Sequence, residues 1–341
     1  MLHFDSDYME GAHPAILERL VTTNFVQTAG YGEDEYSKSA KEKIKKACKC
    51  DDASVYFLVG GTQSNSTVLD ALLKSYEGVI SAKTGHINTH ESGAVEFSGH
   101  KVIELEQHEG KIDADVLNEY LKNFFEDSNY EHMVIPGAVY ISYPTEYGTL
   151  YTKDELSKIS NICRKFDISL FIDGARMGYG IVAKGADITL EYLAQCCDAF
   201  YIGGTKVGAL FGEAVVIKDS KRISHFKTII KQHGALLAKG RILGLQFDTL
   251  FTDNLYFEIA KHANAMADKL KKAFISKGYR LFLDSTTNQQ FVILNNKKIK
   301  ELENKVTFTF WEKYDETSQV IRFVTSWATK EEDIDKMIEL L

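Results

Sequence analysis

Short apolar segments alternate with amphipathic segments between about residues 50 and 217, and this alternation limits the possible folds more than any other feature of the chain. Several apolar segments are uninterrupted runs, which is typical of strands that are covered on both faces. The predicted strands are Val55–Val59, Val79–Ala82, Val102–Leu105, Val139–Tyr143, Leu170–Asp173, Ala199–Gly203 and Ala214–Ile217. Strands that alternate with helices predict βαβ units, and therefore an α/β fold with a mostly parallel sheet.

The last third of the chain has a different pattern. A long helix is predicted over residues 254–277, and short strands follow at Arg280–Leu283, Gln290–Leu294, Val306–Trp311 and Val320–Thr325. Capping-box patterns predict helix starts at Thr152 and at Thr329, each with a glutamate three residues later. We therefore expect a large α/β domain over residues 1–250, including an N-terminal arm, and a small α+β domain over residues 251–341.

Charge and composition exclude several classes of protein. The net charge is −8 at pH 7, no run of lysine and arginine is apparent, and the apolar runs are short. These features predict neither a nucleic-acid partner nor a membrane partner. The first residues lack the pattern of a signal peptide, and the 5 cysteines lack metal-binding spacing. We expect free thiols, no metal site and a cytoplasmic location.

The sequence Gly60-Gly61-Thr62-Gln63-Ser64-Asn65 follows the first predicted strand and opens a helix. A glycine-rich turn at a helix start lets backbone N–H groups approach an anion such as phosphate. The pattern is neither a P-loop nor a dinucleotide-binding fingerprint. Taken alone, it is more typical of an ordinary strand-to-helix turn in which Thr62 is the N-cap.

Two charged residues occupy a strand end at Asp173-Gly-Ala-Arg176. In open α/β sheets, ligands bind at the carboxyl ends of the strands. Asp173 either caps the following turn or faces a protonated heterocycle, and Arg176 has the geometry to hold a carboxylate.

A lysine follows the next strand, in Gly203-Gly-Thr-Lys206. If Lys206 is partly desolvated, its amine is a nucleophile that can form a Schiff base; otherwise it is a solvated surface lysine. His86 and His90 are four residues apart, as in some metal-binding pairs, but no third ligand is nearby. His86 stacks on an aromatic cofactor in a second interpretation, and both histidines are ordinary loop residues in a third.

The order of these features indicates one cofactor. Pyridoxal phosphate needs N–H donors for its phosphate, an anion for its ring nitrogen, a stacking group for its ring and a lysine for its aldehyde. The turn at residues 60–65, His86, Asp173 and Lys206 supply this set in sequence on one sheet.

The chain resembles the fold type I, aminotransferase-like pyridoxal-phosphate enzymes, and within them the threonine aldolase family of β-eliminating lyases, in particular its low-specificity L-threonine aldolases. The matching motifs cover nearly the whole chain. They are Phe4-Asp-Ser-Asp7, Tyr31-Gly-Glu-Asp34, Gly60-Gly-Thr62, His86 to Glu91, Tyr143 to Thr149, Asp173-Gly-Ala-Arg176, Gly204-Thr-Lys206 and Ile321 to Thr329.

The resemblance implies a role for each matching residue. Lys206 would attach the cofactor, Asp173 would pair with its ring nitrogen, and His86 would stack on its ring. Gly61 and Thr62 would bind the phosphate. The remaining implied roles are substrate-carboxylate binding by Ser6, Arg176 and Arg322, proton relay by Glu91, and contact with a neighbouring subunit's site by Tyr31.

The resemblance also implies a reaction and an assembly. The reaction is aldol cleavage of L-threonine or L-allo-threonine to glycine and acetaldehyde; β-elimination or transamination on the same scaffold is the alternative. The substrate is thus a small amino acid, and the assembly is a homotetramer, a dimer of dimers with sites at the dimer interface. Pro144 stands near the place where many family members carry a histidine. The fine substrate and stereochemical preference is therefore left open. The base for the β-hydroxyl group is a separate open point, between His86, acting through water, and Glu91.

Overall fold

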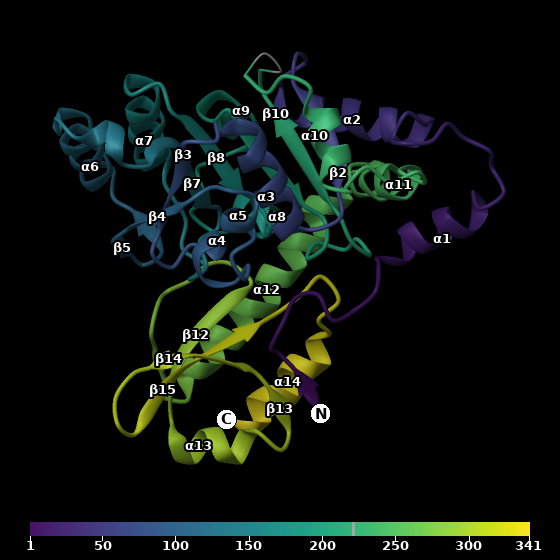
Figure 1. Ribbon diagram of the computed structural model, residues 1–341. Coiled ribbons are helices and arrows are strands. Elements are labelled where there is room, and N and C mark those ends of the chain that lie inside the picture. The colour runs from purple at the N-terminus through teal and green to yellow at the C-terminus, as the bar shows by residue number, and fades with distance from the viewer. Residues whose placement is uncertain (220–221) are drawn as a thin grey trace.

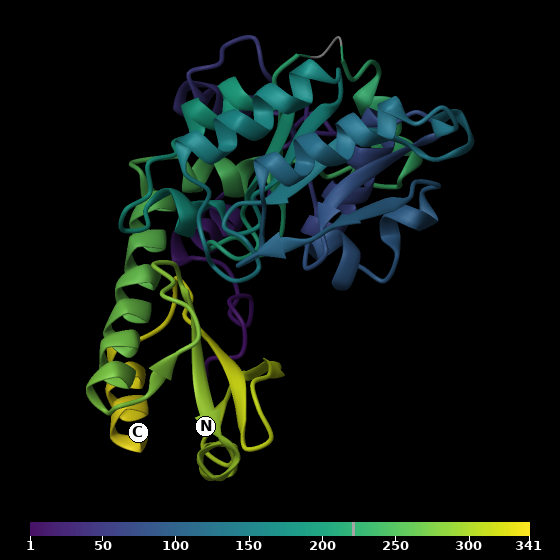
Figure 2. The ribbon, with the colours of Figure 1, turned by 90° about the vertical axis from the view of Figure 1, so that its left-hand side faces the viewer.

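The computed structural model describes residues 1–219 and 222–341, and it contains a larger part around a seven-stranded sheet and a smaller part around a four-stranded sheet. Helix α12 (Leu255–Ser276) runs from the larger part into the smaller one (Figure 1). Both chain ends lie in the smaller part (Figure 2). The division at residue 250 into two domains stays a prediction.

The large sheet contains all seven predicted strands. They are β2 (Ser54–Leu58), β3 (Glu77–Ala82), β4 (Val102–Leu105), β7 (Ile135–Ser142), β8 (Ser169–Asp173), β9 (Ala199–Gly203) and β10 (Glu213–Ile217). Their order is β2-β10-β9-β8-β7-β3-β4, and only β10 runs antiparallel to its neighbours. The expected α/β fold with a mostly parallel sheet is confirmed.

Helices cover both faces of this sheet. One face packs against α2 (Glu35–Cys48), α6 (Ala114–Glu126), α7 (Lys153–Lys165) and α9 (Leu190–Cys196), and the other against α3 (Gly61–Leu72), α5 (Ala94–Phe97) and α10 (Phe226–Gln232). On β8, Leu170 and Ile172 join the first core and Phe171 joins the second. A strand buried on both faces reads as a continuous apolar run, which is the pattern in the sequence.

The remaining elements connect or flank these layers. They are α1 (Pro14–Thr22), α4 (His86–Thr89), β5 (Gln107–His108), β6 (Lys111–Ile112), η1 (Tyr130–His132), α8 (Met177–Ile181), α11 (Arg241–Leu250), α13 (Asn296–Leu302) and α14 (Glu331–Leu340). Within the described residues, no helix is both long enough and apolar enough to cross a membrane.

The two predicted capping boxes have different outcomes. At the start of α7, Thr152 Oγ1 accepts from the Glu155 N–H at 3.2 Å, and Glu155 Oε2 accepts from the Thr152 N–H at 2.7 Å. The prediction at Thr329 is wrong, because α14 begins after Lys330 with no side-chain cap. The Thr329 hydroxyl instead accepts from the Ser326 N–H at 2.8 Å and closes the preceding turn.

The small sheet has the antiparallel order β11-β12-β15-β14. Its strands are β11 (Arg280–Leu281), β12 (Gln289–Asn295), β14 (Thr309–Lys313) and β15 (Ser318–Val324). The strand predicted over residues 306–311 is divided in two, because its first residues form β13 (Val306–Thr307), which pairs with β1 (Leu2–His3). The chain then crosses from β1 to α1 between the two parts (Figure 1).

Candidate functional site

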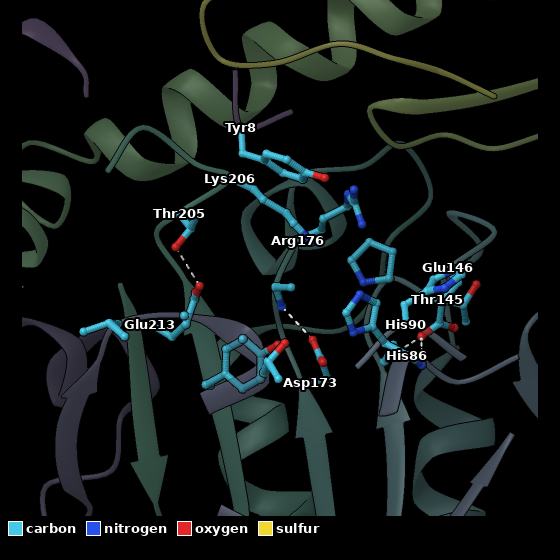
Figure 3. Close-up of a pocket in the computed structure, with 18 residues that line it drawn as sticks. Tyr8, His86, His90, Thr145, Glu146, Asp173, Arg176, Thr205, Lys206 and Glu213 are labelled. Atoms are coloured by element: carbon cyan, nitrogen blue, oxygen red, sulfur yellow. Dashed lines mark hydrogen bonds between the residues drawn. The ribbon is translucent and has the colours of Figure 1, made fainter. Parts of the chain in front are cut away.

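A cavity of about 410 Å³ opens at the carboxyl ends of the large sheet's parallel strands. Parallel neighbours end at the same edge, and the antiparallel β10 begins there, so residues far apart in sequence meet (Figure 3). Six of the predicted site residues line this cavity: Gly61, Thr62, His86, Asp173, Arg176 and Lys206. The structure therefore brings these six residues together, and the roles predicted for them stay predictions.

Asp173 is 4% exposed and ends β8. Its Oδ1 accepts from the Ala175 N–H at 2.9 Å, and its Oδ2 accepts from the Tyr140 hydroxyl at 2.6 Å and the Asn65 amide at 3.0 Å. Burial opposes ionisation of the carboxyl, but the nearby His86 and these hydrogen bonds outweigh it, and the pKa of Asp173 is lowered. The turn-capping interpretation is confirmed by the bond to Ala175. The carboxylate also lines the cavity, and its contact with a protonated heterocycle stays a prediction.

Lys206 lines the cavity, so the alternative of a solvated surface lysine is wrong. Burial, together with the charge of Arg176, lowers the pKa of the Lys206 amine. Beside it, burial raises the pKa of Glu213 to about 8. Glu213, the first residue of β10, accepts from the Gly204 N–H at 3.0 Å and the Thr205 hydroxyl at 2.8 Å. These bonds fix the turn that presents Lys206.

Arg176 is held by Asp7, a partner that the sequence analysis left without a role. Arg176 Nε and Nη2 donate to the two oxygens of Asp7 at 2.7 and 2.9 Å, and Asp7 is fully buried. Asn288 also donates to Asp7, at 2.9 Å. Despite burial, the charges of Arg176 and Lys206 lower the pKa of Asp7. The bond pair ties the N-terminal segment to the turn after β8.

His86 is the first residue of α4, and a hydrogen bond with Glu91 fixes the orientation of its ring. His86 Nδ1 lies 2.7 Å from Glu91 Oε1, which also accepts from the Asn65 amide at 2.7 Å. The Glu91 side chain is fully buried and does not line the cavity. Asn65 thus joins Glu91 and Asp173 in one network. The rings of His86 and His90 are edge-to-face with centroids 5.7 Å apart, and among the described residues no group of three or more potential metal ligands is present.

Gly60 is the N-cap of α3, and it supplies no side-chain cap. The alternative in which Thr62 is the N-cap is wrong, because Thr62 lies inside the helix. The first N–H groups of a helix have no intrahelical acceptor. At the start of α3 they therefore remain available to an anion, as Gly61 and Thr62 line the cavity.

Ser6 and Arg322 lie outside the cavity's immediate lining. Two of their atoms, Ser6 Oγ and Arg322 Nε, are buried without a hydrogen-bond partner. The outer nitrogens of Arg322 donate to Gln289 Oε1 at 3.2 Å and to the Asp5 carbonyl at 3.3 Å. Burial and the charge of Arg176 lower the pKa of Arg322 to about 10.

Tyr31 is not at this cavity. Its side chain is 46% exposed, and Lys231 Nζ lies 4.7 Å from the centre of its ring. Contact with a neighbouring subunit stays a prediction for this residue.

Several cavity residues were missed by the sequence analysis: Tyr8, Glu146, Tyr201 and Glu213. A signal was available for two of them, since Glu146 and Glu213 are acidic residues next to predicted strand ends. Asp7, Asn65 and Tyr140 act behind the wall, where only the folded structure brings them to their partners.

Comparison with known proteins agrees with this geometry. Residues 3–297 match the model of the family described as Beta-eliminating lyase. The low specificity L-threonine aldolase of Pseudomonas sp. (strain NCIMB 10558) is 31% identical over 333 residues, which cover 96% of this chain and 93% of that protein. The low specificity L-threonine aldolase of Pseudomonas aeruginosa is 30% identical over 99% of this chain and 95% of that protein.

Solved structures give the same result for the fold. A threonine aldolase of Leishmania major is 41% identical, with a TM-score of 0.96, and the match covers 100% of this chain and 98% of that one. An aspartate aminotransferase from Thermus thermophilus is 16% identical with a TM-score of 0.71, over 100% of this chain and 90% of that one. The expected aminotransferase-like fold is confirmed.

Replacing Asp7 should destabilise the protein strongly. Asp7→Asn leaves Arg176 and Lys206 without their buried counter-charge, so the free energy of unfolding should fall by on the order of 3 kcal/mol. Urea unfolding measures the change. The matched control is Asp268→Asn, which removes a half-exposed i,i+4 pair with Lys272 and should cost at most about 0.5 kcal/mol. Equal effects of the two variants would contradict the structural role of Asp7.

Proposed function

The chain belongs to the β-eliminating lyase family, and from this premise we propose that it is a pyridoxal-phosphate-dependent aldolase that cleaves L-threonine and L-allo-threonine to glycine and acetaldehyde. The family resemblance expected from the motifs is confirmed. The observation that carries the proposal is that the Lys206 amine, whose pKa is lowered by desolvation, and the buried carboxylate of Asp173 line one cavity.

The residues present fit this cofactor. Asp173 is a buried anion, and no lysine or arginine of the described residues forms a salt bridge with it. A buried charge needs a partner, and a protonated ring nitrogen is one. When bound, pyridoxal phosphate supplies an aldehyde that condenses with amines and a ring that accepts the electron pair of a bond broken at the substrate's α-carbon.

We assign the holding of the cofactor to residues of the cavity wall. Lys206 attaches it through an amine whose lowered pKa favours the neutral nucleophile. Asp173 keeps the ring nitrogen protonated, and the N–H groups of Gly61 and Thr62 receive the phosphate. His86 stacks on the ring.

Glu91 acts on His86 in this proposal. Its hydrogen bond to Nδ1 fixes which ring nitrogen carries a proton and holds the ring plane in place. The proton relay expected for Glu91 would therefore pass through His86, because Glu91 itself is shielded from the cavity.

The substrate's carboxylate is assigned to Ser6, Arg176 and Arg322. Ser6 Oγ and Arg322 Nε are buried donors without partners, which is costly unless a ligand satisfies them. Arg176 is already oriented by Asp7 and leaves Nη1 for the ligand. A carboxylate held by such donors orients the bond that is to break.

Other pyridoxal-phosphate reactions on this scaffold break a different bond. β-Elimination would release pyruvate from serine, and transamination would release a keto acid. The proposed reaction releases acetaldehyde from threonine. An assay of all three products with purified holoenzyme tests the proposal, and release of keto acid without acetaldehyde would overturn it.

We also propose a homotetramer built from dimers, located in the cytoplasm. Exposed apolar side chains on the N-terminal arm support the assembly: Val21 is 75% exposed and Phe25 is 94% exposed. Among the described residues, Lys206 is the one lysine and Arg176 the one arginine that line the cavity. A neighbouring subunit would therefore supply further positive charge for the phosphate. The free thiols of all 5 cysteines support a reducing compartment.

Lys206→Ala should abolish acetaldehyde release. The variant lacks the amine that attaches the cofactor, so borohydride reduction should no longer add the cofactor's mass to the protein. Mass spectrometry and the product assay measure both effects. The control Lys83→Ala, at an exposed lysine paired with Glu106, should behave as the parent enzyme. Turnover near the parent rate in Lys206→Ala would exclude this assignment.

Arg322→Lys should raise KM for threonine and weaken glycine binding, because an ammonium group cannot reproduce the forked contact of a guanidinium. The value of kcat should fall too, since the torsion of the bound amino acid is less restricted. Steady-state kinetics and a glycine titration test this. Arg280→Lys, at an exposed arginine of the same small sheet, is the matched control. If KM and glycine affinity stay constant, the carboxylate is bound elsewhere.

Phe25→Asp should break the assembly, because it places a charge in an apolar interface. Light scattering after size-exclusion chromatography should give the mass of a tetramer for the parent and a smaller mass for the variant. A parent enzyme that is monomeric at the concentration of the assay would contradict the proposed assembly.

A further inference from the structure

Glu146 has a buried carboxyl group at the cavity wall, and it has no role in the proposed binding of the cofactor or of the substrate's carboxylate. It follows β7, the neighbour of the strand that carries Asp173, and it is 9% exposed. Its Oε1 accepts from the Ser142 hydroxyl at 2.6 Å and from the His86 N–H at 3.0 Å. Among the described residues, no other side chain donates to Oε2. Oε1 is therefore held by two donors, Oε2 has no side-chain donor, and Glu146 lies in the wall of the cavity (Figure 3).

The proposed aldol cleavage needs a base at the substrate's β-hydroxyl group. A general base must lie within hydrogen-bond reach of the proton that it removes. Glu91 does not meet this condition, because His86 and Asn65 cover it and it does not line the cavity. His86 has its Nδ1 engaged by Glu91, and the ring face is assigned to the cofactor. Glu146 is the carboxylate that lines the cavity next to His86 with an oxygen free.

We propose that Glu146 is the general base that removes the proton of the substrate's β-hydroxyl group. The inference rests on the proposed aldolase function and deepens it. The proton passes to Glu146 Oε2, and the electron pair of the O–H bond forms the carbonyl of the departing aldehyde. The Cα–Cβ bond breaks, its electron pair stays with the α-carbon, and a proton then returns there to give glycine. Atoms and charge balance without a further reactant.

The surroundings of Glu146 suit this task. Burial raises the pKa of Glu146, while the Ser142 hydroxyl and the charge of His86 lower it and Asp173 raises it further. A base is most effective when its pKa is near the operating pH. The titratable and charged groups around it are His86 on α4, His90 directly after α4, Tyr140 on β7, Asp173 on β8, Tyr147 and Tyr151 after β7, and Arg176 and Lys206 across the cavity.

The direction of the pH effect follows from the charge state. A carboxylate is a base only when ionised, so activity is present above the pKa of Glu146 and is lost as the pH falls through it. The acid limb of the profile of kcat/KM against pH therefore belongs to Glu146. Glu146→Gln should lower kcat for threonine on the order of 10²–10⁴-fold and remove this limb.

A second reaction at the same site distinguishes the loss of the base from a general disruption of the site. Exchange of the glycine α-proton in D₂O, followed by NMR, needs the cofactor and Lys206 but has no β-hydroxyl group. Glu146→Gln should keep this exchange and should keep glycine binding, measured by absorbance titration of the holoenzyme. Loss of both along with cleavage would show a general disruption and overturn the proposal.

Two further variants make the test specific. Ser142→Ala removes a bond that lowers the pKa of Glu146, so the acid limb should move to higher pH. Glu312→Gln is the matched control: this carboxylate accepts from the Tyr147 hydroxyl at 3.0 Å outside the cavity, and its profile should equal that of the parent.

The results distinguish this inference from the proposed function. A parent enzyme that releases no aldehyde refutes the aldolase itself. A parent that cleaves threonine, beside a Glu146→Gln variant with the parental rate and acid limb, refutes only the base. If Glu91→Gln removes the limb and Glu146→Gln does not, the base acts through His86 and the proposal is wrong. Should Glu146→Gln not fold, the limb in Ser142→Ala decides, because an unmoved limb overturns the assignment.

Discussion

The site depends on the way parallel strands end. Neighbouring parallel strands finish at one edge of a sheet, and this edge gathers residues that are more than a hundred positions apart in sequence. Asp173 ends β8, Lys206 follows β9, and Glu146 follows β7. The single antiparallel strand contributes from its opposite end, so Glu213 joins the same edge. A site assembled in this way needs most of the sheet, since Glu146, Asp173, Lys206 and Glu213 are each positioned by a different strand.

Collecting charges at one buried edge has an energetic cost, and the structure offsets it by pairing. Asp7 reaches Arg176 from the N-terminal segment, and that segment is anchored by the pairing of β1 with β13. Breaking a buried pair leaves an uncompensated charge, which costs far more than the loss of a surface pair. The N-terminal segment is thus part of the site. Its ion pair also joins the larger part of the molecule to the smaller one, since Asn288 donates to the same carboxylate.

The sequence predicted correctly those features that depend on neighbouring residues in the chain. Short apolar segments predicted all seven strands of the large sheet, and strand-end positions identified Asp173 and Lys206 as cavity residues. The predictions were wrong where contacts with distant segments determine the local structure. The stretch 306–311 looks like one strand, but its first residues pair with the N-terminus. Thr329 has the spacing of a cap, yet its hydroxyl closes a turn with Ser326. The role of Asp7 could not be predicted from the sequence, because its partner Arg176 is 169 residues away.

The carboxyl groups at this edge differ in their environments, and the environments separate their tasks. Asp173 receives hydrogen bonds on both oxygens, so it stays ionised although it is buried. Glu146 receives its bonds on one oxygen, and burial raises its pKa. Groups whose surroundings move their pKa values apart can serve as a permanent charge and as an exchangeable base in one site. The sequence shows both as acids near strand ends. The number of hydrogen-bond donors around each carboxyl group, which only the fold supplies, is the basis for proposing a permanent charge at Asp173 and proton transfer at Glu146.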